Sequence, residues 1–468
     1  MQEYRHFFEG KRITLLGLGL LGRGVGDAEF LAHCGANIVV TDKKTEVELA
    51  ESVARLKKYP NIEFHLGGHK IEDFITADMI IKAAGVQLNS PEIAAARAAG
   101  VPVYMSTALF TKYATDAGAK IVGVTGTRGK STVAHMIFHV LKHTAPRQSS
   151  QPSPEATAGT AGRERKVFLG GNIRGKSTLS MLPEVQKGDI CVLELDSWQL
   201  QGFGDLQISP RVAVITNLML DHLNYYRGDM DAYFSDKANI FRFQKPGDVF
   251  IAGASVAERA HANALPLDPI IPESLPYAWK LKVLGEHNRE NASFAATALQ
   301  ALGLSDDEIR ESLESFEGVE GRLQLVREVG GVKIYNDNNA TTPEAVVAAL
   351  RALSDVRFRK PNIILIVGGA DKGLDMSELV AEINKICKVV ILLAGTGTSR
   401  LLEARSYKLE ASTHGPYDSL DQTVHKALEL AKPGDAVLFS PAFASFGMFK
   451  NEYDRNDQFL TLVDKLAP

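Results

Sequence analysis

Short apolar runs alternate with helical patterns along almost the whole chain. Runs rich in Val, Ile and Leu, without polar alternation, are typical of strands that are buried on both faces of a parallel sheet. Helical stretches such as PEAVVAALRAL (343–353) separate these runs. The pattern therefore predicts an α/β fold. The predicted strands are ITLLGLG (13–19), NIVVTD (37–42), MIIKAAG (79–85), IVGVTG (121–126), CVLEL (191–195), VAVITN (212–217), NIILIVGG (362–369), VVILLAG (389–395) and AVLFSPA (436–442).

The predicted strands fall into three groups along the chain. A chain of 468 residues is too long for one hydrophobic core, because a domain commonly holds about 150 residues. We therefore predict three domains with mainly parallel sheets, over residues 1–112, 113–320 and 321–468. The segment 144–166 interrupts the pattern, since Ser, Pro, Ala, Thr and Gly dominate it, and we expect a flexible surface loop there.

Composition and charge narrow the class of protein. With a net charge of −4, the chain has no basic excess to neutralise a phosphate backbone, so a nucleic-acid partner is not expected. The three cysteines are far apart in sequence, which excludes a disulfide framework and a zinc ribbon and favours a reducing compartment. The most apolar stretch, 13–22, is about half the length of a membrane span. We expect a cytoplasmic monomer with no membrane partner.

Two stretches compete for the role of phosphate loop. GGNIRGKS (170–177) fits the pattern G-x-x-x-x-G-K-[ST], whereas VTGTRGKST (124–132) has Val124 where the first glycine should be. The second stretch, however, follows the apolar strand AKIVGVT and opens an amphipathic helix, which is the context that turns backbone N–H groups toward an anion. Pro183 shortens any helix after the first stretch. We predict that the phosphate loop consists of Gly126, Thr127, Arg128, Gly129, Lys130, Ser131 and Thr132.

Glu194 is a candidate metal ligand. It ends the apolar strand ICVLE, at the carboxyl edge where open α/β sheets bind ligands, and a nucleotide site with Mg²⁺ needs such a carboxylate.

A second glycine fingerprint lies near the N-terminus. GLGLLG (17–22) follows a strand, and Asp42 ends the next strand, which by itself indicates an NAD site and a dehydrogenase. A separate nucleotide site in the central domain argues against this alternative. Nearby, His65 and His69 have i, i+4 spacing, but the glycines between them make a helical metal site improbable, and we expect a surface loop.

Several motifs, taken in order and spacing, resemble the Mur ligases. The likeness is greatest to the members that add D-glutamate to UDP-N-acetylmuramoyl-L-alanine, and it covers essentially the whole chain apart from 144–166. The motifs are GTRGKST (126–132), GGN (170–172), LELDSWQL (193–200), NLMLDHLNYY (217–226), SDKANIF (235–241), GEHNRENA (285–292), YNDNNAT (335–341), VGGADKG (367–373) and SPAFASFGMFKN (440–451).

The resemblance implies an architecture and a reaction. The N-terminal domain would be Rossmann-like and hold the UDP part of the substrate, the central P-loop domain would bind ATP, and the C-terminal dinucleotide-fold domain would close over the site. A substrate carboxylate would take the γ-phosphoryl group of ATP, and the amine of glutamate would attack the resulting acyl phosphate. This reaction belongs to peptidoglycan precursor synthesis.

The resemblance also implies the catalytic and ATP-binding residues. Lys130 would act on the transferring phosphoryl group, and two Mg²⁺ ions would be held by Ser131, Glu194, His222 and Lys237. Carbamylation by CO₂ would convert the cationic Lys237 into an anionic ligand. The residues implied around ATP outside the loop are Asn288, Asn291, Arg322 and Asp337.

Substrate residues follow from the same resemblance. For the UDP-linked substrate they are Leu20, Leu21, Asp42, Gly85, Asn172 and Gln199. For the amino acid they are Thr341, Lys372, Ser445 and Phe446. Lys372 could pair with an acidic side chain, which favours glutamate.

Four positions depart from the usual pattern of the D-glutamate-adding members. They are Asp196 for Ser, Gly321 for His, Asn339 for Lys and Glu452 for Phe. An L-glutamate-adding ligase at the same step is therefore an alternative. Folylpolyglutamate synthesis is a more distant one, since those enzymes lack the N-terminal Rossmann-like region, and a catalytically silent nucleotide-binding partner is another.

Overall fold

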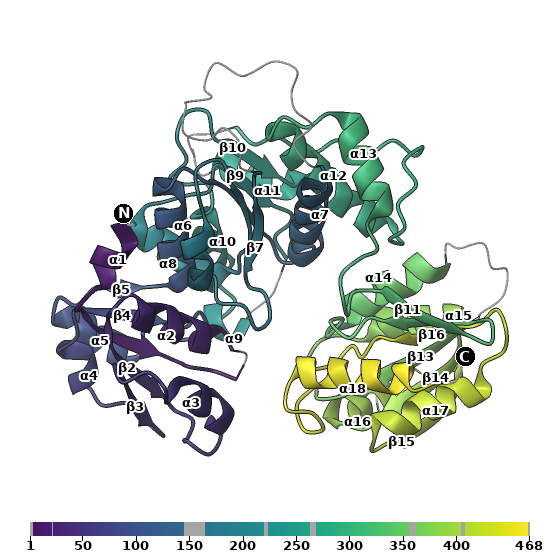
Figure 1. The fold of residues 1–468 in the computed structure, drawn as a ribbon. Helices are drawn as coiled ribbons and strands as arrows, with labels where there is room; N and C mark the ends of the chain where they lie inside the picture. The colour runs from purple at the N-terminus through teal and green to yellow at the C-terminus, as the bar shows by residue number, and fades with distance from the viewer. Residues whose placement is uncertain are drawn as a thin grey trace. The chain divides into compact units, whose positions relative to one another are not determined.

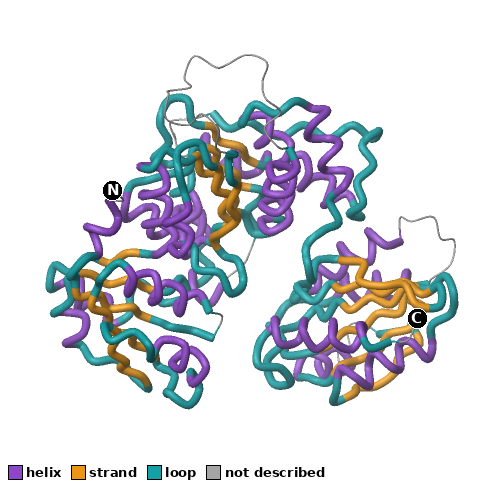
Figure 2. The backbone as a smooth tube through the Cα atoms, in the orientation of Figure 1, coloured by secondary structure: helices purple, strands orange, loops and turns teal. Residues whose placement is uncertain are grey.

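Three sheets form in the part of the chain that the computed structural model describes, namely residues 3–20, 22–144, 164–219, 223–262, 268–354, 362–403 and 408–466 (Figures 1 and 2). The predicted strands at nine positions are all present, with ends that differ by a few residues. The α/β class with mainly parallel sheets is confirmed.

The first sheet is entirely parallel and has the strand order β3-β2-β1-β4-β5. Its strands are β1 (Arg12–Leu16), β2 (Asn37–Asp42), β3 (Ile62–Leu66), β4 (Met79–Lys82) and β5 (Val103–Tyr104). The helices of this part are α1 (Glu3–Phe8), α2 (Arg23–His33), α3 (Ala50–Leu56), α4 (Glu72–Ile75), α5 (Pro91–Ala98) and α6 (Ser106–Asp116).

The second sheet is also parallel, with the order β10-β9-β6-β8-β7. Its strands are β6 (Lys120–Thr125), β7 (Val167–Gly171), β8 (Ile190–Glu194), β9 (Val212–Ile215) and β10 (Val249–Ala252). The accompanying helices are α7 (Lys130–His143), the 3₁₀ helix η1 (Leu179–Glu184), α8 (Ser197–Leu206), α9 (Leu223–Tyr226), α10 (Met230–Ala238), α11 (Ala254–Ala262), α12 (Glu286–Ala301) and α13 (Asp306–Ser315).

The third sheet has the order β11-β12-β16-β13-β14-β15, and β11 is its antiparallel edge strand. Its strands are β11 (Gln324–Val329), β12 (Val332–Asn336), β13 (Ile363–Gly368), β14 (Cys387–Leu393), β15 (Ser412–Tyr417) and β16 (Ala436–Phe439). Its helices are α14 (Pro343–Ser354), α15 (Ser377–Ile386), α16 (Thr396–Glu403), α17 (Leu420–Leu430) and α18 (Glu452–Asp464).

The chain forms two compact units. Unit 1 is Met1–Ser274 with Asn291–Ser312, and it contains the first two sheets; unit 2 is Leu275–Glu290 with Leu313–Pro468, and it contains the third. One continuous core joins the two sheets of unit 1, with Phe8 and Phe30 from the first part and Leu193 and Phe250 from the second.

Burial on both faces explains the apolar strands of unit 2. Along β13, Ile363, Leu365 and Val367 belong to one core, while Ile364 and Ile366 belong to another on the opposite face. Helices α14 and α15 contribute to the first core, and α17 and α18 contribute to the second (Figure 1). Such two-sided cover is what an apolar run without alternation requires.

No helix within the described ranges is both long enough and apolar enough to cross a bilayer.

Candidate nucleotide and substrate site

The stretch 124–132 forms a turn between a central strand and a helix. β6 ends at Thr125, and α7 begins at Lys130. The turn needs its glycines: Gly126 has φ 143° and Gly129 has φ 83°. A Cβ at Gly126 would lie 2.0 Å from Thr216 Oγ1, and one at Gly129 would lie 2.3 Å from Asn291 Oδ1. The turn therefore has the tight backbone and helix N-terminus that suit a phosphate group.

The end of β9 holds this turn in place. Thr216 Oγ1 donates to the Arg128 carbonyl oxygen at 2.5 Å, and Asn217 Oδ1 accepts from the Arg128 N–H at 2.9 Å. Thr127 N–H donates to the Asn217 carbonyl oxygen at 3.0 Å, and Met219 N–H donates to Thr127 Oγ1 at 2.9 Å. The loop is thus fixed before any nucleotide binds, which lowers the ordering cost of binding.

Two lysines reach the same backbone oxygen of the turn. Lys130 Nζ donates to the carbonyl oxygens of Gly126 and Thr127 at 2.9 and 3.0 Å. Lys237 Nζ donates to the Gly126 carbonyl oxygen at 3.1 Å and to Thr125 Oγ1 at 3.2 Å. Lys237 is only 1% exposed, so it is not the solvated surface lysine that a helix usually carries.

Helix α10 presents Lys237 to the turn together with Tyr233. The two residues have i, i+4 spacing and share one helix face. Lys237 Nζ lies 4.7 Å from the centre of the Tyr233 ring, and the Tyr233 hydroxyl lies 3.4 Å from Thr127 Oγ1. The helix is anchored by Asp236, whose carboxylate accepts from Gln201 Nε2 at 2.8 Å and from the Tyr226 hydroxyl at 2.9 Å.

Glu194 is a buried carboxylate next to the turn at 126–129. It ends β8 opposite Val124 of the neighbouring β6, and it is 4% exposed. In the described ranges of the chain, no hydrogen bond or ion pair engages its carboxylate. A buried charge is stable only when paired or bound to a metal, so this donor fits a divalent cation. Ser131, the predicted partner ligand, is 7% exposed in the first turn of α7.

The stretch that fits the phosphate-loop pattern has a different structure. β7 ends at Gly171, and only the 3₁₀ helix η1, which contains Pro183, follows. The turn between them contacts α2 of the first sheet: Arg23 Nη1 donates to Asn172 Oδ1 at 2.8 Å, and Ser177 Oγ donates to Asp27 Oδ1 at 2.5 Å. Of these two stretches, only 124–132 joins a strand to an α-helix through a turn, as its sequence context predicts.

A cavity of about 220 Å³ lies beside the glycine fingerprint of unit 1. Leu20 and Gly85, both predicted substrate residues, line it together with Gln199. Arg23 is another lining residue, and its guanidinium donates a hydrogen bond to Asn172, a further predicted substrate residue. The remaining lining residues are Leu15, Gly17, Leu18, Gly19, Gly24, Asp27, Lys82, Ala83, Ala84, Met105, Ser106, Thr107, Gly171, Ser177 and Thr178.

Two of the predicted substrate residues also shape the backbone. Asp42 accepts from the N–H of Gly19 at 3.1 Å and from that of Lys44 at 2.9 Å, so its carboxylate fixes the glycine turn. Gln199 is part of a capping box at the start of α8, in which Asp196 accepts from the Gln199 N–H at 2.7 Å. Asp196, which stands where the family pattern has Ser, therefore caps the start of helix α8.

The charged lining residues of the cavity were not predicted. Arg23 directly follows the glycine fingerprint, and a cation at that place in the sequence is a usable signal for an anionic ligand. Lys82 is 2% exposed, donates to the Val86 carbonyl oxygen at 2.9 Å, and has its pKa lowered to about 8 by burial. Burial also raises the pKa of Asp27 to about 6, although hydrogen bonds from Ser177 and Ser106 lower it.

In unit 2, Asp337 lies just beyond the end of β12. It accepts from the Ser440 hydroxyl at 2.7 Å and from the Leu323 N–H at 2.9 Å. Burial raises its pKa to about 7, although these hydrogen bonds and the charge of Arg322 lower it. Arg322 itself is exposed. These positions fit the prediction that Asp337 and Arg322 face a ligand, but their role remains a prediction.

The predicted amino-acid residues lie on neighbouring loops of unit 2. Lys372 Nζ donates to Thr341 Oγ1 at 2.9 Å. Ser445 is buried, whereas Phe446 is 68% exposed. Lys372 and Thr341 thus come together, whereas the roles of Ser445 and Phe446 stay predictions.

The remaining predicted residues lie elsewhere or are not described. Asn291 contacts the turn at Gly129 within unit 1, while Asn288 belongs to unit 2 and donates to the Leu284 carbonyl oxygen at 2.8 Å. His222 and Leu21 lie outside the described residues. Among the residues that are described, no three His, Cys, Asp or Glu side chains cluster as metal ligands.

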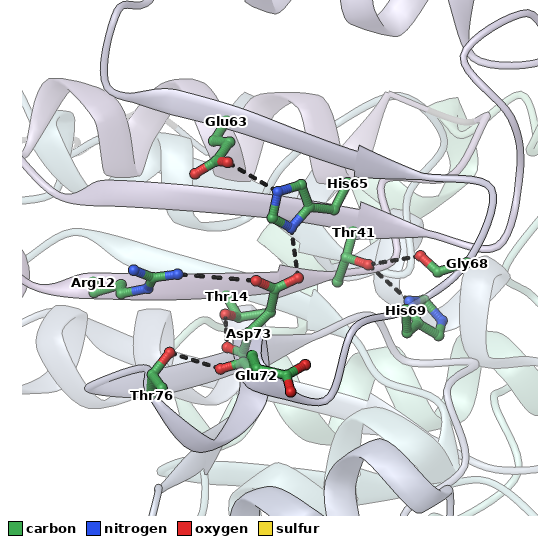
Figure 3. A network of polar contacts seen from close by, with 10 residues as sticks. All are labelled: Arg12, Thr14, Thr41, Glu63, His65, Gly68, His69, Glu72, Asp73 and Thr76. Atoms are coloured by element: carbon green, nitrogen blue, oxygen red, sulfur yellow. Dashed lines mark hydrogen bonds and ion pairs between the residues drawn. The ribbon is translucent and has the colours of Figure 1, made fainter.

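The expected surface loop at His65 is wrong. His65 lies on β3, with Nδ1 2.6 Å from Asp73 Oδ2 and Nε2 2.9 Å from Glu63 Oε1 (Figure 3). His69 Nδ1 lies 2.8 Å from Thr41 Oγ1. This strand alternates polar and apolar residues, so it lacks the continuous apolar run by which the other strands were predicted. The two histidines contact different residues, so they do not form a metal site together, as expected from the sequence.

Comparison with known proteins agrees with this geometry. The description "Mur ligase MurD-like, N-terminal domain" matches residues 11–105, "Mur ligase middle domain" matches 124–270, and "Mur ligase, glutamate ligase domain" matches 321–443. The chain belongs to the Mur ligase family. This membership confirms the predicted family and enzyme class, that of ATP-dependent amide ligases.

Curated relatives match over nearly their whole length. A protein of Roseiflexus sp. (strain RS-1), named UDP-N-acetylmuramoylalanine--D-glutamate ligase, is 35% identical, and the match covers 98% of this chain and 99% of that protein. A protein of the same name from Borreliella afzelii (strain PKo) is 34% identical over 97% of each chain.

Solved structures share the fold. The UDP-N-acetylmuramate-alanine ligase of Thermotoga maritima matches with a TM-score of 0.61 and 20% identity, over 97% of this chain and 99% of that one. The MurF ligase of the same organism, solved in complex with ADP, matches with a TM-score of 0.55 and 19% identity, over 92% and 94% of the two chains.

Proposed function

We propose that this protein joins D-glutamate to UDP-N-acetylmuramoyl-L-alanine with hydrolysis of ATP to ADP and phosphate, in peptidoglycan precursor synthesis. The names of the curated relatives support this substrate pair. The proposal rests on the turn at 126–129, to which both Lys130 and Lys237 donate, and on the buried Glu194 carboxylate at the adjoining strand end, which no residue within the described ranges contacts by a hydrogen bond or ion pair.

The reaction sets one anion against another. A carboxylate oxygen of the first substrate attacks the γ-phosphorus of ATP, the bond to the bridging oxygen breaks, and ADP leaves. The glutamate amine then attacks the carbonyl carbon of the acyl phosphate, loses a proton, and expels phosphate. Lys130 and the N–H groups of the turn stabilise negative charge that moves toward the bridging oxygen.

Glu194, Ser131 and His222 would hold Mg²⁺, with Lys237 in its carbamylated form. When bound, such ions neutralise charge on the phosphoryl oxygens. The burial of Glu194 and Lys237 supports this assignment. A carbamate forms when the neutral amine of Lys237 takes up CO₂ and releases a proton. The number of ions and the carbamate are parts of the proposal.

The cavity beside the glycine fingerprint suits the UDP part of the first substrate. The turn N–H groups and the N-terminus of α2 favour an anion, and Arg23 adds a guanidinium that can bind phosphate oxygens. Asn172 positions Arg23 through their 2.8 Å hydrogen bond. The NAD-dependent dehydrogenase is not favoured, because family membership assigns this fingerprint to a ligase.

Unit 2 supplies the residues for the amino acid. Lys372, held by Thr341, provides a cation for the side-chain carboxylate of glutamate. Asn339 and Glu452 make this region less positive than the usual pattern. L-glutamate as the acceptor is nevertheless not favoured, because the curated relatives are named as D-glutamate ligases. We also propose that the enzyme is a cytoplasmic monomer.

The decisive experiment measures ADP release by the purified chain with UDP-N-acetylmuramoyl-L-alanine, ATP and Mg²⁺. Separate reactions contain D-glutamate, L-glutamate or no amino acid. We expect release to depend on D-glutamate and the product to gain one glutamyl residue by mass spectrometry. Turnover confined to L-glutamate would replace the assigned enantiomer, and the absence of turnover with either would refute the proposed ligase activity.

A further inference from the structure

Arg455 is a cation in the interior of unit 2. It lies on α18 and is 0% exposed, and burial lowers its pKa to about 10, although Glu452 raises it. Burying a charge is costly unless it is fully hydrogen-bonded. Such a residue therefore needs a structural or functional reason, and its contacts supply one.

The guanidinium donates three hydrogen bonds to loops at the carboxyl edge of the third sheet. Nε donates to Asn338 Oδ1 at 2.8 Å, and Nη2 donates to the Asn338 carbonyl oxygen at 2.9 Å. Nη1 donates to the Phe443 carbonyl oxygen at 3.1 Å. Asn338 follows β12 and Phe443 follows β16, and these strands are parallel neighbours. One planar guanidinium thus ties two strand-end loops together.

These loops carry the residues assigned to the ligands of unit 2. The first loop contains Asp337 and Thr341, and the second contains Ser445. Between them, Ala442 N–H donates to the Ala340 carbonyl oxygen at 2.9 Å, and Ala442 has a positive φ of 64°. A non-glycine residue in this conformation persists only where its surroundings hold it.

Anchoring of α18 does not depend on Arg455 alone. Phe459 of the same helix stacks on Phe439 of β16, with ring centres 4.4 Å apart. At the other end, Arg327 Nη1 donates to the carbonyl oxygens of Val463 and Asp464, both at 3.1 Å. Arg455 contacts the loops at the sheet edge, whereas Arg327 contacts the end of the helix.

We propose that Arg455 is a positioning residue for the amino-acid step: its hydrogen bonds to Asn338 and Phe443 set the spacing between the loops 337–341 and 441–446. Arg455 is fully buried and acts through the loops. The inference rests on the proposed function, because it assigns these loops to glutamate. Lysine at this position would keep the charge but could not reproduce the planar fork.

The test compares Arg455→Lys and Arg455→Met with the control Arg327→Met, which removes an arginine that also binds backbone carbonyls of α18. For each variant we would measure KM for D-glutamate, KM for UDP-N-acetylmuramoyl-L-alanine, kcat, and amide hydrogen exchange.

Because misplacement of a bound reactant by about 1 Å can cost 100-fold in rate, we expect KM for D-glutamate to rise or kcat to fall about 10-fold or more in both Arg455 variants. KM for the UDP-linked substrate, whose cavity lies in unit 1, should stay within about twofold, because a mutation that leaves its contacts intact removes no binding energy. In both Arg455 variants, amides in 338–341 and 442–446 should exchange faster than in the wild type, whereas amides of the buried strand β13 should exchange at the wild-type rate.

Arg327→Met should leave the D-glutamate parameters and the exchange of these loops unchanged. The proposal is overturned if folded Arg455 variants keep wild-type kinetics for D-glutamate and wild-type exchange in the two loops, or if they change only the melting temperature. If Arg455→Met does not fold, Arg455→Lys and Asn338→Ala, which removes the acceptor of Nε, decide by the same readouts. If the wild-type protein shows no turnover, the proposed function fails, and hydrogen exchange alone still decides whether Arg455 fixes the loops.

Discussion

Lys130 and Lys237 share one acceptor, because both Nζ atoms donate to the carbonyl oxygen of Gly126, at 2.9 and 3.1 Å. Two ammonium groups this close repel each other, and little solvent screens them, since Lys237 is buried. A carbamate on Lys237 would replace the repulsion by attraction between an anion and the Lys130 cation.

This relationship leads to the first prediction, which concerns the carbamate itself. The enzyme incubated with ¹³C-labelled bicarbonate should show a carbamate carbon signal that Lys237→Ala lacks. We expect Lys237→Ala to lower kcat by a factor of 100 or more, on the order of the loss of an electrostatic catalytic group. The surface variant Lys245→Ala serves as the control. A full-activity enzyme without the signal would contradict the carbamate.

The second prediction separates the two candidate phosphate loops. Lys130→Ala should lower kcat by about 100-fold to 1,000-fold, because it removes the charge that acts on the transferring phosphoryl group. Lys176→Ala, in the stretch that fits the sequence pattern, should leave KM for ATP unchanged. Steady-state ADP release at varied ATP measures both. The opposite ranking of the two variants would reverse the assignment of the ATP site.

The third prediction concerns Arg23. Arg23→Met should weaken binding of UDP-N-acetylmuramoyl-L-alanine by about 10-fold to 100-fold, because it removes a charge-assisted contact to phosphate, while KM for ATP stays within about twofold. Calorimetric titration measures the affinity. Arg55→Met is a matched control, since Arg55 is another arginine of the first part of unit 1 and pairs with Glu29 of α2. Equal affinity of wild type and Arg23→Met would remove Arg23 from the substrate site.

The fourth prediction concerns stability and pH. The pKa of Asp337 is raised to about 7 by burial, so the folded protein holds this proton at pH values where the unfolded chain has released it. The group therefore favours folding at low pH, and the free energy of unfolding should fall as pH rises from about 4 toward 7, by at most about 1.4 kcal/mol per pH unit. Asp27, with a pKa raised to about 6, adds a contribution of the same sign.

Thermal unfolding of Asp337→Asn between pH 5 and 8 tests this prediction. The variant should lose less stability than the wild type as pH rises, whereas Asp464→Asn, which changes an exposed residue, should follow the wild type. Parallel curves for the wild type and Asp337→Asn would show that Asp337 does not titrate in this range.

Local sequence patterns predicted the parts of the fold that depend on neighbours in the chain. The apolar runs gave the central strands, and the helix after Lys130 distinguished the turn at 126–129 from the stretch at 170–177. Strand β3 was missed because IEFHL alternates polar and apolar residues, which made His65 look like a loop residue. Strand β7 was missed because only VFL is apolar in it.

Long-range contacts could not be predicted from such patterns. Thr216 and Asn217 form hydrogen bonds with Arg128 in the turn at 126–129, although they lie 88 and 89 positions away in the chain. Arg455 likewise contacts Asn338, which lies 117 positions earlier. Nothing in the residues next to Arg455 shows that its side chain is buried. The resemblance to a family gave the residues that are expected to contact ligands, whereas the hydrogen bonds that fix those residues in place became visible only in three dimensions.

Asn172 links the cavity beside the glycine fingerprint to the end of β8. Its side chain accepts from Arg23, which lines that cavity, and its N–H donates to the carbonyl oxygen of Glu194 at 2.7 Å. A ligand that draws Arg23 into a new position therefore pulls on the strand end at Glu194. Binding at the cavity should then change the affinity of any ligand held at that strand end, and thermodynamic reciprocity requires the converse effect to be equally large.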